Sequence, residues 1–286
     1  MLGGEIVSAD SRYLYRGLDI GTAKPSLQER ARVPHHLIDV TFPDQPWSLA
    51  QYKTAATHAI AEIHERGRLP MLVGGTGQYI RAIVEGWVIP PKPINSMIRH
   101  KLEHEGRQEG GASALHGRLA ELDARAAAEI DPRNVRRLIR ALEVCLATGE
   151  PFSTQRTKHQ VPYRMYVLGL TMPRTELYAR IDARIEDMIA EGLVQEVRRL
   201  VQSGHHWDLP AMSALGYRQI GGYLRGEYGL GEAVRLIKRD TRRLVRQQSS
   251  WFSAHDSSIV WYEANKTDPE FISRSIQRWL HSKHVR

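Results

Sequence analysis

A carboxylate follows the first apolar segment of the chain. Residues Glu5–Ala9 are predicted to form a short buried strand, and Asp10 and Ser11 come directly after it. In open parallel α/β sheets, ligands bind at the carboxyl ends of the strands. A carboxylate there can take a proton from a nucleophile or position a metal-bound water. The alternative is a helix cap, because Asp and Ser are preferred capping residues, and position alone leaves both open.

A glycine-rich turn follows a second apolar strand. Leu69–Val73 is continued by Gly74-Gly75-Thr76-Gly77, after which a helix is expected from Gln78 to Val84. Backbone N–H groups in such a turn can hold a phosphate oxygen. However, no lysine follows the glycines, as the phosphate-loop pattern requires. Taken alone, the turn is therefore interpreted as a tight strand–helix connection.

Two predicted helices carry basic stripes, which recur at three- and four-residue spacing. The first consists of Arg133, Arg136, Arg137 and Arg140; the second consists of Arg235, Lys238, Arg239, Arg242, Arg243 and Arg246. A solvated face is the usual meaning of such a run. Few acids compensate these stripes, since only Glu143 lies near the first and Asp240 within the second. We therefore favour contacts with phosphates.

Arg180 and Arg184 lie four residues apart and share one helical face. They could form a clamp for a diphosphate, or they could pair with Glu176 and Glu186 at the surface. Spacing alone favours the surface pairs. No residue is predicted as a metal ligand.

Composition limits the class of protein. Of the 286 residues, 42% are apolar, which excludes a disordered chain. Lys and Arg number 40 against 32 Asp and Glu, and the net charge of +8 favours a polyanionic partner, whether nucleic acid, acidic membrane surface or phosphorylated substrate. The single cysteine, Cys145, excludes an internal disulfide and favours a reducing compartment. No apolar run approaches the roughly 18 residues of a membrane span, and no signal peptide is recognised, so we expect a cytoplasmic protein.

The elements that must position these residues follow from periodicity. A strand, a helix over 49–66, a second strand, the glycine turn and a further helix predict a right-handed parallel α/β unit. A charged, alanine-rich insertion follows, and after it a helix over 133–146. Further strands are expected at 166–170 and 259–261, and further helices at 174–191, 193–203, 231–252 and 268–281. We expect an α/β core over 1–90, a helical insertion over 91–131, and the remainder of the core with C-terminal helices over 132–286.

The chain closely resembles the bacterial tRNA dimethylallyltransferases. The matching stretches, which run in order along essentially the whole chain, are Ile6–Arg12, Gly17–Pro25 (Gly-Leu-Asp-Ile-Gly-Thr-Ala-Lys-Pro), Pro34–Asp39, Leu72–Gly77, Arg137–Val144 and Leu215–Gln219. The Gly-Thr-Ala-Lys-Pro run is the most specific of them. The resemblance implies an α/β fold with a parallel-sheet core like that of P-loop NTPases, an inserted helical segment and a helical C-terminal part.

The resemblance also implies an activity, which is transfer of a dimethylallyl group from dimethylallyl diphosphate to N6 of the adenosine adjacent to the anticodon in tRNA. It implies Mg²⁺ as cofactor and a monomer. Asp10 is then the general base, and Arg184, with Arg180 beside it, binds the diphosphate. The implied tRNA contacts are Asp10, Ser11, Arg12, Tyr13, Thr76, Arg99, Arg136, Arg137, Leu138, Ile139 and Arg140.

The sequence departs from the family pattern in two places. In the family, the strand matching Ile6–Asp10 is the second one, after a first strand, a phosphate loop with lysine and threonine, and a helix. The 286 residues begin at Met1-Leu2-Gly3-Gly4, so we expect that segment, and the threonine that usually ligates Mg²⁺, to be absent. Gln247 and Ser253 stand where basic residues are usual. The alternative hypothesis is therefore a tRNA-binding protein that lacks the diphosphate site and does not transfer a prenyl group.

Overall fold

The computed structural model describes residues 2–89, 96–154 and 158–282. It divides the chain into two compact units. The sheet unit consists of Met1–Ile80 and Pro162–Arg286, and the helical unit is Arg81–Val161. Helix α3 (Gly77–Val84) begins in the first and ends in the second.

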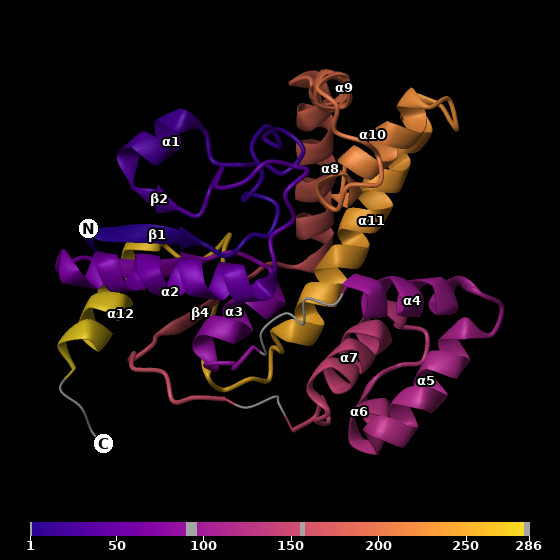
Figure 1. Ribbon diagram of the computed structural model, residues 1–286. Coiled ribbons are helices and arrows are strands. Elements are labelled where there is room, and N and C mark those ends of the chain that lie inside the picture. Colours follow the sequence, from indigo (N-terminus) through magenta and orange to yellow (C-terminus); the bar gives the residue numbers. More distant parts are fainter. Residues whose placement is uncertain (1, 90–95, 155–157, 283–286) are drawn as a thin grey trace. The chain divides into compact units, whose positions relative to one another are not determined.

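Parallel strands form the centre of the sheet unit. Strands β1 (Gly4–Ser8), β2 (His35–His36) and β3 (Leu69–Val73) are ordered β2-β1-β3, and all pairs are parallel. Ser8 is in register with Val73, so the carboxyl ends of β1 and β3 meet at one edge. Helix α2 (Leu49–Glu65) packs along these two strands, and a capping box at Ser48 starts it (Figure 1).

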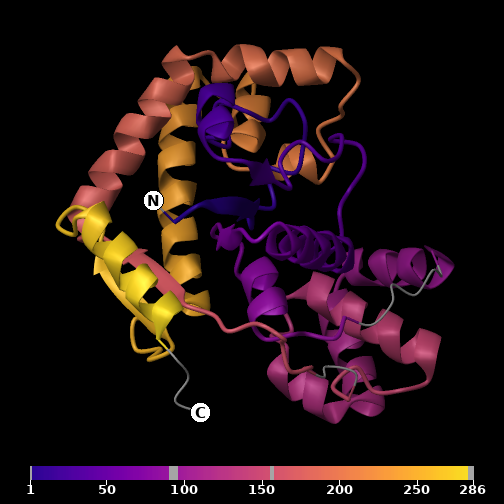
Figure 2. The same cartoon turned by 90° about the vertical axis from the view of Figure 1, so that its left-hand side faces the viewer.

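A second parallel sheet consists of β4 (Val167–Thr171) and β5 (Ile259–Glu263). Helix α12 (Pro269–His281) packs on it, with Tyr166 against Trp279 and Tyr262 against Phe271. The long helices α8 (Arg174–Ala190) and α11 (Leu230–Trp251) run side by side in opposite directions (Figures 1 and 2).

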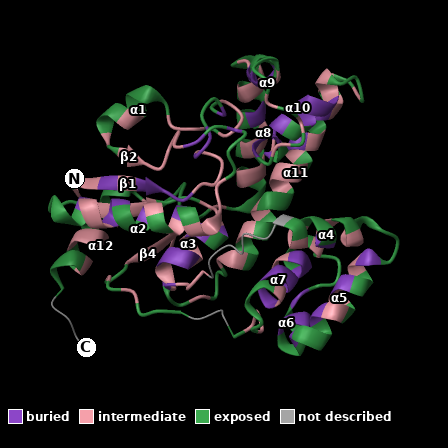
Figure 3. Cartoon of the chain, in the orientation of Figure 1, coloured by how far each residue is buried: buried purple, intermediate pink, exposed green. Residues whose placement is uncertain are grey.

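The main core of the sheet unit lies where α8 and α11 meet α9 (Leu193–Gln202), the short 3₁₀ helix η1 (Ala211–Ser213) and α10 (Tyr217–Leu224). Leu193, Met212 and Tyr217 are fully buried there, and Figure 3 shows buried segments on α9 and α10. Leu18, from the segment after β1, is buried in the same cluster. The segment that follows Asp10 is therefore anchored in a core built from the C-terminal half of the chain.

The helical unit has a core of its own. Helices α4 (Ser96–Arg107), α5 (Gly111–Leu122) and α7 (Val135–Thr148) bury leucines against one another, and α6 (Ala124–Glu129) adds buried alanines. This division differs from the expected insertion over 91–131, because α7 packs against α4 and α5 and so belongs with them. The expected boundary at 90 and 91 lies outside the described residues.

The observed elements confirm an α/β fold with parallel strands. Each helix and strand expected from periodicity is present within about three residues of its predicted bounds. Outside the helical insertion, four elements of the described residues were not predicted, namely α1 (Leu27–Arg32), β2, η1 and α10. Ser26 and Glu29 form a capping box at α1, a signal that the sequence carries. Among the described residues, no helix is both long enough and apolar enough to cross a membrane.

Candidate active site

Asp10 lies at the carboxyl end of β1 and is half-buried. Its Oδ1 accepts a hydrogen bond from the backbone N–H of Arg12 at 2.7 Å. Burial raises the pKa of Asp10, and the backbone N–H groups of Arg12 and Tyr13 oppose that rise. A turn follows Asp10, not a helix, so the alternative of a helix cap is not what the structure shows. The carboxylate is more basic than an ordinary aspartate, which suits a proton acceptor.

The glycine-rich turn after β3 is joined to the end of β1 by three hydrogen bonds. Ala9 N donates to Val73 O at 2.7 Å, and Thr76 N donates to Ala9 O at 3.1 Å. Ser11 N donates to Thr76 Oγ1 at 3.0 Å. Two of the predicted site residues, Ser11 and Thr76, are therefore in direct contact although 65 residues separate them.

The glycines of this turn allow close packing. A Cβ on Gly74 would lie 2.3 Å from the carbonyl carbon of Ala9, and a Cβ on Gly77 would lie 2.3 Å from the ring of Trp251. These distances are far below van der Waals contact, so only glycine fits without movement of backbone or ring. The interpretation of this segment as a tight strand–helix connection is confirmed.

Asp10 and Arg184 both act on the phenol of Tyr13. Burial raises the pKa of Tyr13 to about 12; the negative charge of Asp10 adds to that rise and the positive charge of Arg184 opposes it. Both charges must be close to the phenol to act on it. Tyr13 Oη donates to Ala23 O at 2.8 Å, which links this residue to the Gly-Thr-Ala-Lys-Pro segment.

Arg180 and Arg184 are exposed on α8. Within the part of the chain that the structure describes, neither makes an ion pair. The acids proposed as their alternative partners are engaged elsewhere, since Glu176 accepts from Asn265 and Glu186 pairs with Lys238. The surface pairs that spacing favoured are therefore not formed, and both guanidinium groups are available to an anion.

Arg12 is used within the chain. Its Nη1 donates to Pro210 O at 2.8 Å and its Nη2 lies 3.4 Å from Ser213 Oγ. These bonds fasten the turn after Asp10 to η1. The side chain expected to contact tRNA thus has an internal role in holding this turn.

The Gly-Thr-Ala-Lys-Pro segment is held in place by ion pairs and hydrogen bonds. Lys24, whose side chain is 1% exposed, donates to Tyr15 O and pairs with Asp19 and Asp39, each at 2.6 Å. The backbone N–H groups of residues 19, 20 and 21 donate to the carboxylate of Glu196 on α9. Sequence reasoning missed Glu196, because its partners lie 175–177 residues away along the chain.

In the helical unit, two predicted contact residues from different helices meet. Arg99 on α4 and Arg140 on α7 bond to Oε2 of Glu143 at 3.4 and 3.1 Å. Glu143 is 1% exposed, whereas the side chains of Arg99 and Arg140 are partly exposed. The buried carboxylate therefore holds both guanidinium groups at the surface of the helical unit.

The other residues of the predicted α7 site divide between surface and core. Arg136 and Arg137 are exposed, and neither makes an ion pair among the described residues. Leu138 and Ile139 are buried in the core of the helical unit. The expectation that these two side chains contact RNA is corrected accordingly, because the apolar stripe of an amphipathic helix faces its core.

The basic stripe on α11 is largely neutralised. Arg235 pairs with Glu232, Lys238 with Glu186, Arg239 with Asp240 and Arg242 with Asp182. This corrects the expectation that few acids compensate the stripe, since two of these acids are supplied by the neighbouring helix α8. Arg243 and Arg246 remain exposed, with no ion pair in the described ranges.

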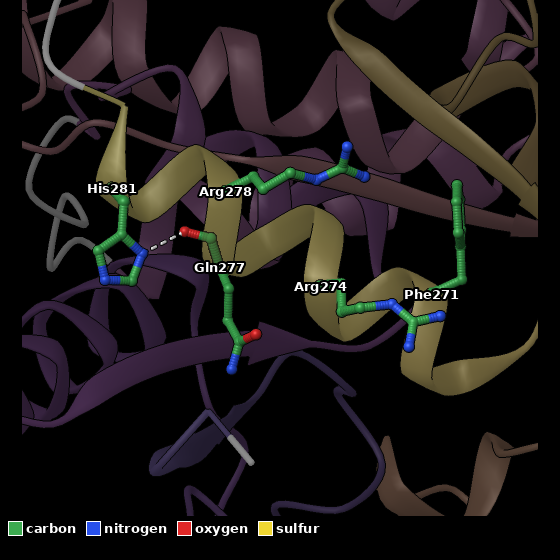
Figure 4. A pocket seen from close by; sticks show the side chains of 5 residues that line it. All are labelled: Phe271, Arg274, Gln277, Arg278 and His281. Atoms are coloured by element: carbon green, nitrogen blue, oxygen red, sulfur yellow. Dashed lines mark hydrogen bonds between the residues drawn. The ribbon is translucent and has the colours of Figure 1, made fainter.

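Two surface hollows lie away from these residues. One is lined by Phe271, Arg274, Gln277, Arg278 and His281, all on α12, and their side chains do not converge on a common point (Figure 4). The other lies along the outer face of α2, beside Trp47 and Leu37. Neither contains a predicted site residue.

Parallel strands carry a carboxylate of raised pKa at the carboxyl end of β1, and α8 carries two arginines without ion pairs among the described residues. These features define an α/β protein that can bind an anionic ligand and accept a proton. The comparisons agree with this class. The family model described as IPP transferase matches residues 13–255. The tRNA dimethylallyltransferase of Roseiflexus sp. (strain RS-1) is 56% identical over 87% of this chain and 81% of its own length. That of Thermomicrobium roseum is 52% identical over 92% of this chain and 80% of its own. The chain belongs to the tRNA dimethylallyltransferase (IPP transferase) family.

Solved structures are similar as well. The tRNA isopentenylpyrophosphate transferase of Bacillus halodurans superposes with a TM-score of 0.69 at 39% identity, covering 98% of this chain and 88% of that one. A eukaryotic dimethylallyltransferase acting on tRNA gives a TM-score of 0.82 over 100% of this chain and 75% of that one. At 23% identity, the second likeness concerns the fold alone.

Proposed function

We propose that this chain transfers a dimethylallyl group from dimethylallyl diphosphate to N6 of the adenosine adjacent to the anticodon in tRNA. The observation that supports this most directly is the half-buried carboxylate of Asp10 at the end of β1, next to Tyr13, whose phenol is also within the influence of the Arg184 charge. A carboxylate of raised pKa and a cation that act on the same phenol suit a reaction that releases one proton and one anion.

In the proposed step, the N6 nitrogen attacks C1 of the dimethylallyl group. A bond forms between N6 and C1, the bond between C1 and the diphosphate oxygen breaks, and the diphosphate leaves with that electron pair. The N6 proton passes to Asp10. Because burial raises the pKa of Asp10, the carboxylate is a better acceptor than one in water, and its bond from Arg12 N aims it.

Arg180 and Arg184 are proposed to hold the diphosphate. Two guanidinium groups four residues apart on α8, without acid partners among the described residues, can stabilise the charge that grows on the leaving group. Family membership implies Mg²⁺, which would neutralise the same charge. The described residues contain no group of three His, Cys, Asp or Glu side chains that could ligate a metal. We therefore assign no protein ligand to it.

For tRNA, we propose that Arg99, Arg136, Arg137 and Arg140 contact phosphates. They are presented by α4 and α7, and Glu143 orients two of them. Ser11, Arg12, Tyr13 and Thr76 would surround the target base, with Arg12 acting through the loop it fastens. Phosphate contacts supply affinity and register, and the residues around Asp10 supply the chemistry.

Single-turnover transfer of labelled dimethylallyl from its diphosphate to saturating tRNA tests the proposal with the 286-residue chain. Transfer is expected from the wild type, and Asp10→Ala should lower the rate by ~10²–10⁴ with little change in tRNA affinity. Asp44→Ala, at an exposed aspartate of the same unit, is the matched control. Wild-type protein that binds tRNA without transfer would favour the alternative of a binding protein. A rate above about a tenth of wild type in Asp10→Ala would remove Asp10 from the role of base.

A further inference from the structure

Tyr79 on α3 has a fixed ring. It stacks on Tyr52 of α2 with ring centroids 3.6 Å apart and planes 11° from parallel. Tyr52 is fully buried, and its Oη donates to Ser8 O in β1 at 3.0 Å. Tyr79 itself is 6% exposed. The strand that leads to Asp10 therefore supports Tyr52, and Tyr52 supports the ring of Tyr79.

The hydroxyl of Tyr79 is nevertheless free. Among the described residues, no hydrogen-bond partner is found for it. Of the three other buried tyrosines of the sheet unit, Tyr52 donates to Ser8 O and Tyr217 donates to Glu196, whereas for Tyr15, as for Tyr79, no partner of the hydroxyl is found among the described residues. Tyr79 Oη is not one of the buried side-chain atoms without a partner among the described residues, so solvent reaches it although the ring is buried. A donor held in place by a fixed ring and open to solvent is available to an acceptor on a ligand.

This hydroxyl lies in the neighbourhood of the proposed base. Burial raises the pKa of Tyr79 to about 12, with nearby Tyr15 and Asp10 adding to the rise and Arg12 opposing it. The phenol is therefore protonated, and a donor, at neutral pH. The chain holds it in this place through Thr76, whose carbonyl accepts from Tyr79 N at 2.9 Å and whose Oγ1 accepts from Ser11 N.

An acceptor and a donor close together match the edge of adenine. The N6 amine donates hydrogen bonds, and the ring nitrogens on either side of it, N1 and N7, accept them. A carboxylate can accept from N6 but offers nothing to a ring nitrogen while it is ionised. Guanine places a carbonyl oxygen where adenine has the amine, so the same carboxylate would face an acceptor.

We propose that Tyr79 Oη donates a hydrogen bond to a ring nitrogen beside N6 of the target adenosine, so that Asp10 and Tyr79 together select adenine. This rests on the proposed function, since it takes the target adenosine to be held at Asp10. The hydroxyl is then a specificity determinant that touches the substrate. A site built to donate to a substrate atom discriminates strongly against an analogue that lacks that atom.

The test pairs one variant with three substrates. Anticodon stem-loops carrying adenosine, 1-deazaadenosine or 7-deazaadenosine at the target position are compared with wild type and Tyr79→Phe, in single-turnover kcat/KM. Tyr79→Phe should lower the value for adenosine about 10-fold. With the one analogue that lacks the contacted nitrogen, wild type should lose a similar factor and Tyr79→Phe should cause no further loss. Equal loss from Tyr79→Phe on all three substrates would overturn the proposal.

The same comparison is made on the dissociation constants of the stem-loops without dimethylallyl diphosphate. This separates the inference from the proposed function. If wild type fails to prenylate the adenosine stem-loop, the function is wrong, and dependence of the Tyr79→Phe effect on one ring nitrogen in binding still supports the contact. Equal weakening of all three stem-loops contradicts it. Tyr166→Phe, which removes a hydroxyl bonded to Tyr262 in the second sheet, is the control and should change neither measurement.

Discussion

The hydroxyl of Tyr217 donates a hydrogen bond of 2.5 Å to Oε1 of Glu196 in the interior of the sheet unit. The same carboxylate accepts from the backbone N–H groups of Asp19, Ile20 and Gly21. Successive N–H groups of this kind form a concavity that binds anions. Here a side chain of the protein fills it, and this fastens the segment after the Asp10 loop to α9 and α10. Burial, reinforced by Glu196, raises the pKa of Tyr217, so the phenol remains a donor.

Removal of that hydroxyl should be costly. Tyr217→Phe is expected to lower the free energy of unfolding by about 1.5–3 kcal/mol, because the lost bond is to a charged group. Urea denaturation measures the change. Tyr228→Phe, which removes a bond of 3.0 Å to the carbonyl of Gln219, is the control. It should lower the free energy of unfolding by about 0.5–1.5 kcal/mol. An equal loss in both variants would show that the hydrogen bond to Glu196 contributes no more than a bond to a neutral carbonyl.

The ionised carboxylate of Asp10 should lower the free energy of unfolding at neutral pH. Burial raises the pKa of Asp10 in the folded protein, so the folded state binds the proton more tightly than the unfolded state. The free energy of unfolding therefore falls as the pH rises from the unfolded-state pKa of Asp10 to its folded-state pKa. Asp10→Asn, which keeps an acceptor for Arg12 N, is expected to raise the melting temperature at pH 7. The gain should shrink as pH falls and Asp10 becomes protonated. A gain that is the same at pH 4 and pH 7 would contradict the raised pKa.

The pH dependence of transfer has the same origin. The base must be ionised, so the single-turnover rate should fall on acidification with a midpoint above the ordinary aspartate value. Rates measured across the acidic range with saturating tRNA check this. A midpoint at or below that of a solvated aspartate would mean either that Asp10 is not the base or that substrate binding removes the effect of burial.

The exposed arginines of α7 should determine the salt dependence of tRNA binding. Arg136→Gln and Arg137→Gln should each reduce the log–log salt slope by roughly 0.7 to 0.9, as expected for one lost phosphate contact. Arg133→Gln removes the same charge, but Arg133 pairs with Asp131 at 2.9 Å and is the control. Filter-binding titrations at several salt concentrations give the slopes. An equal effect of all three variants would indicate general attraction to the basic surface.

Gly74 should be intolerant of any side chain. In Gly74→Ala the new Cβ would lie 2.3 Å from the carbonyl carbon of Ala9, which is backbone and bonded to Thr76 N. We expect a loss of 1–3 kcal/mol or more of stability, together with loss of transfer. Gly117→Ala, in α5 with nothing within 4 Å of the new Cβ, is the opposite case and should stabilise by about 0.5–1 kcal/mol. Thermal denaturation distinguishes the two directions.

Local patterns along the chain determined most of the secondary structure. Ser48 and the apolar stripe after it define α2, Gly149 ends α7 at a φ of 71°, and continuous apolar runs define the strands. Of the elements that were missed, α1 carries a capping box at Ser26, whereas β2 and α10 lack a clear local signal. Strand β2 has two residues, and α10 contains Gly221 and Gly222, which disfavour a helix in isolation. Burial of Tyr217 and Ile220 in the core holds α10 in place.

For the candidate site, the sequence by itself placed Asp10 at a strand end and separated the glycine turn from a phosphate loop, because both depend on neighbours in the chain. Only the tertiary structure joined Ser11 to Thr76, set Tyr79 on Tyr52, and supplied Asp182 and Glu186 to the arginine stripe on α11. These partners are 27 to 65 residues apart in the sequence. Periodicity reports which face of an element is apolar, but which charges and rings meet across elements depends on packing.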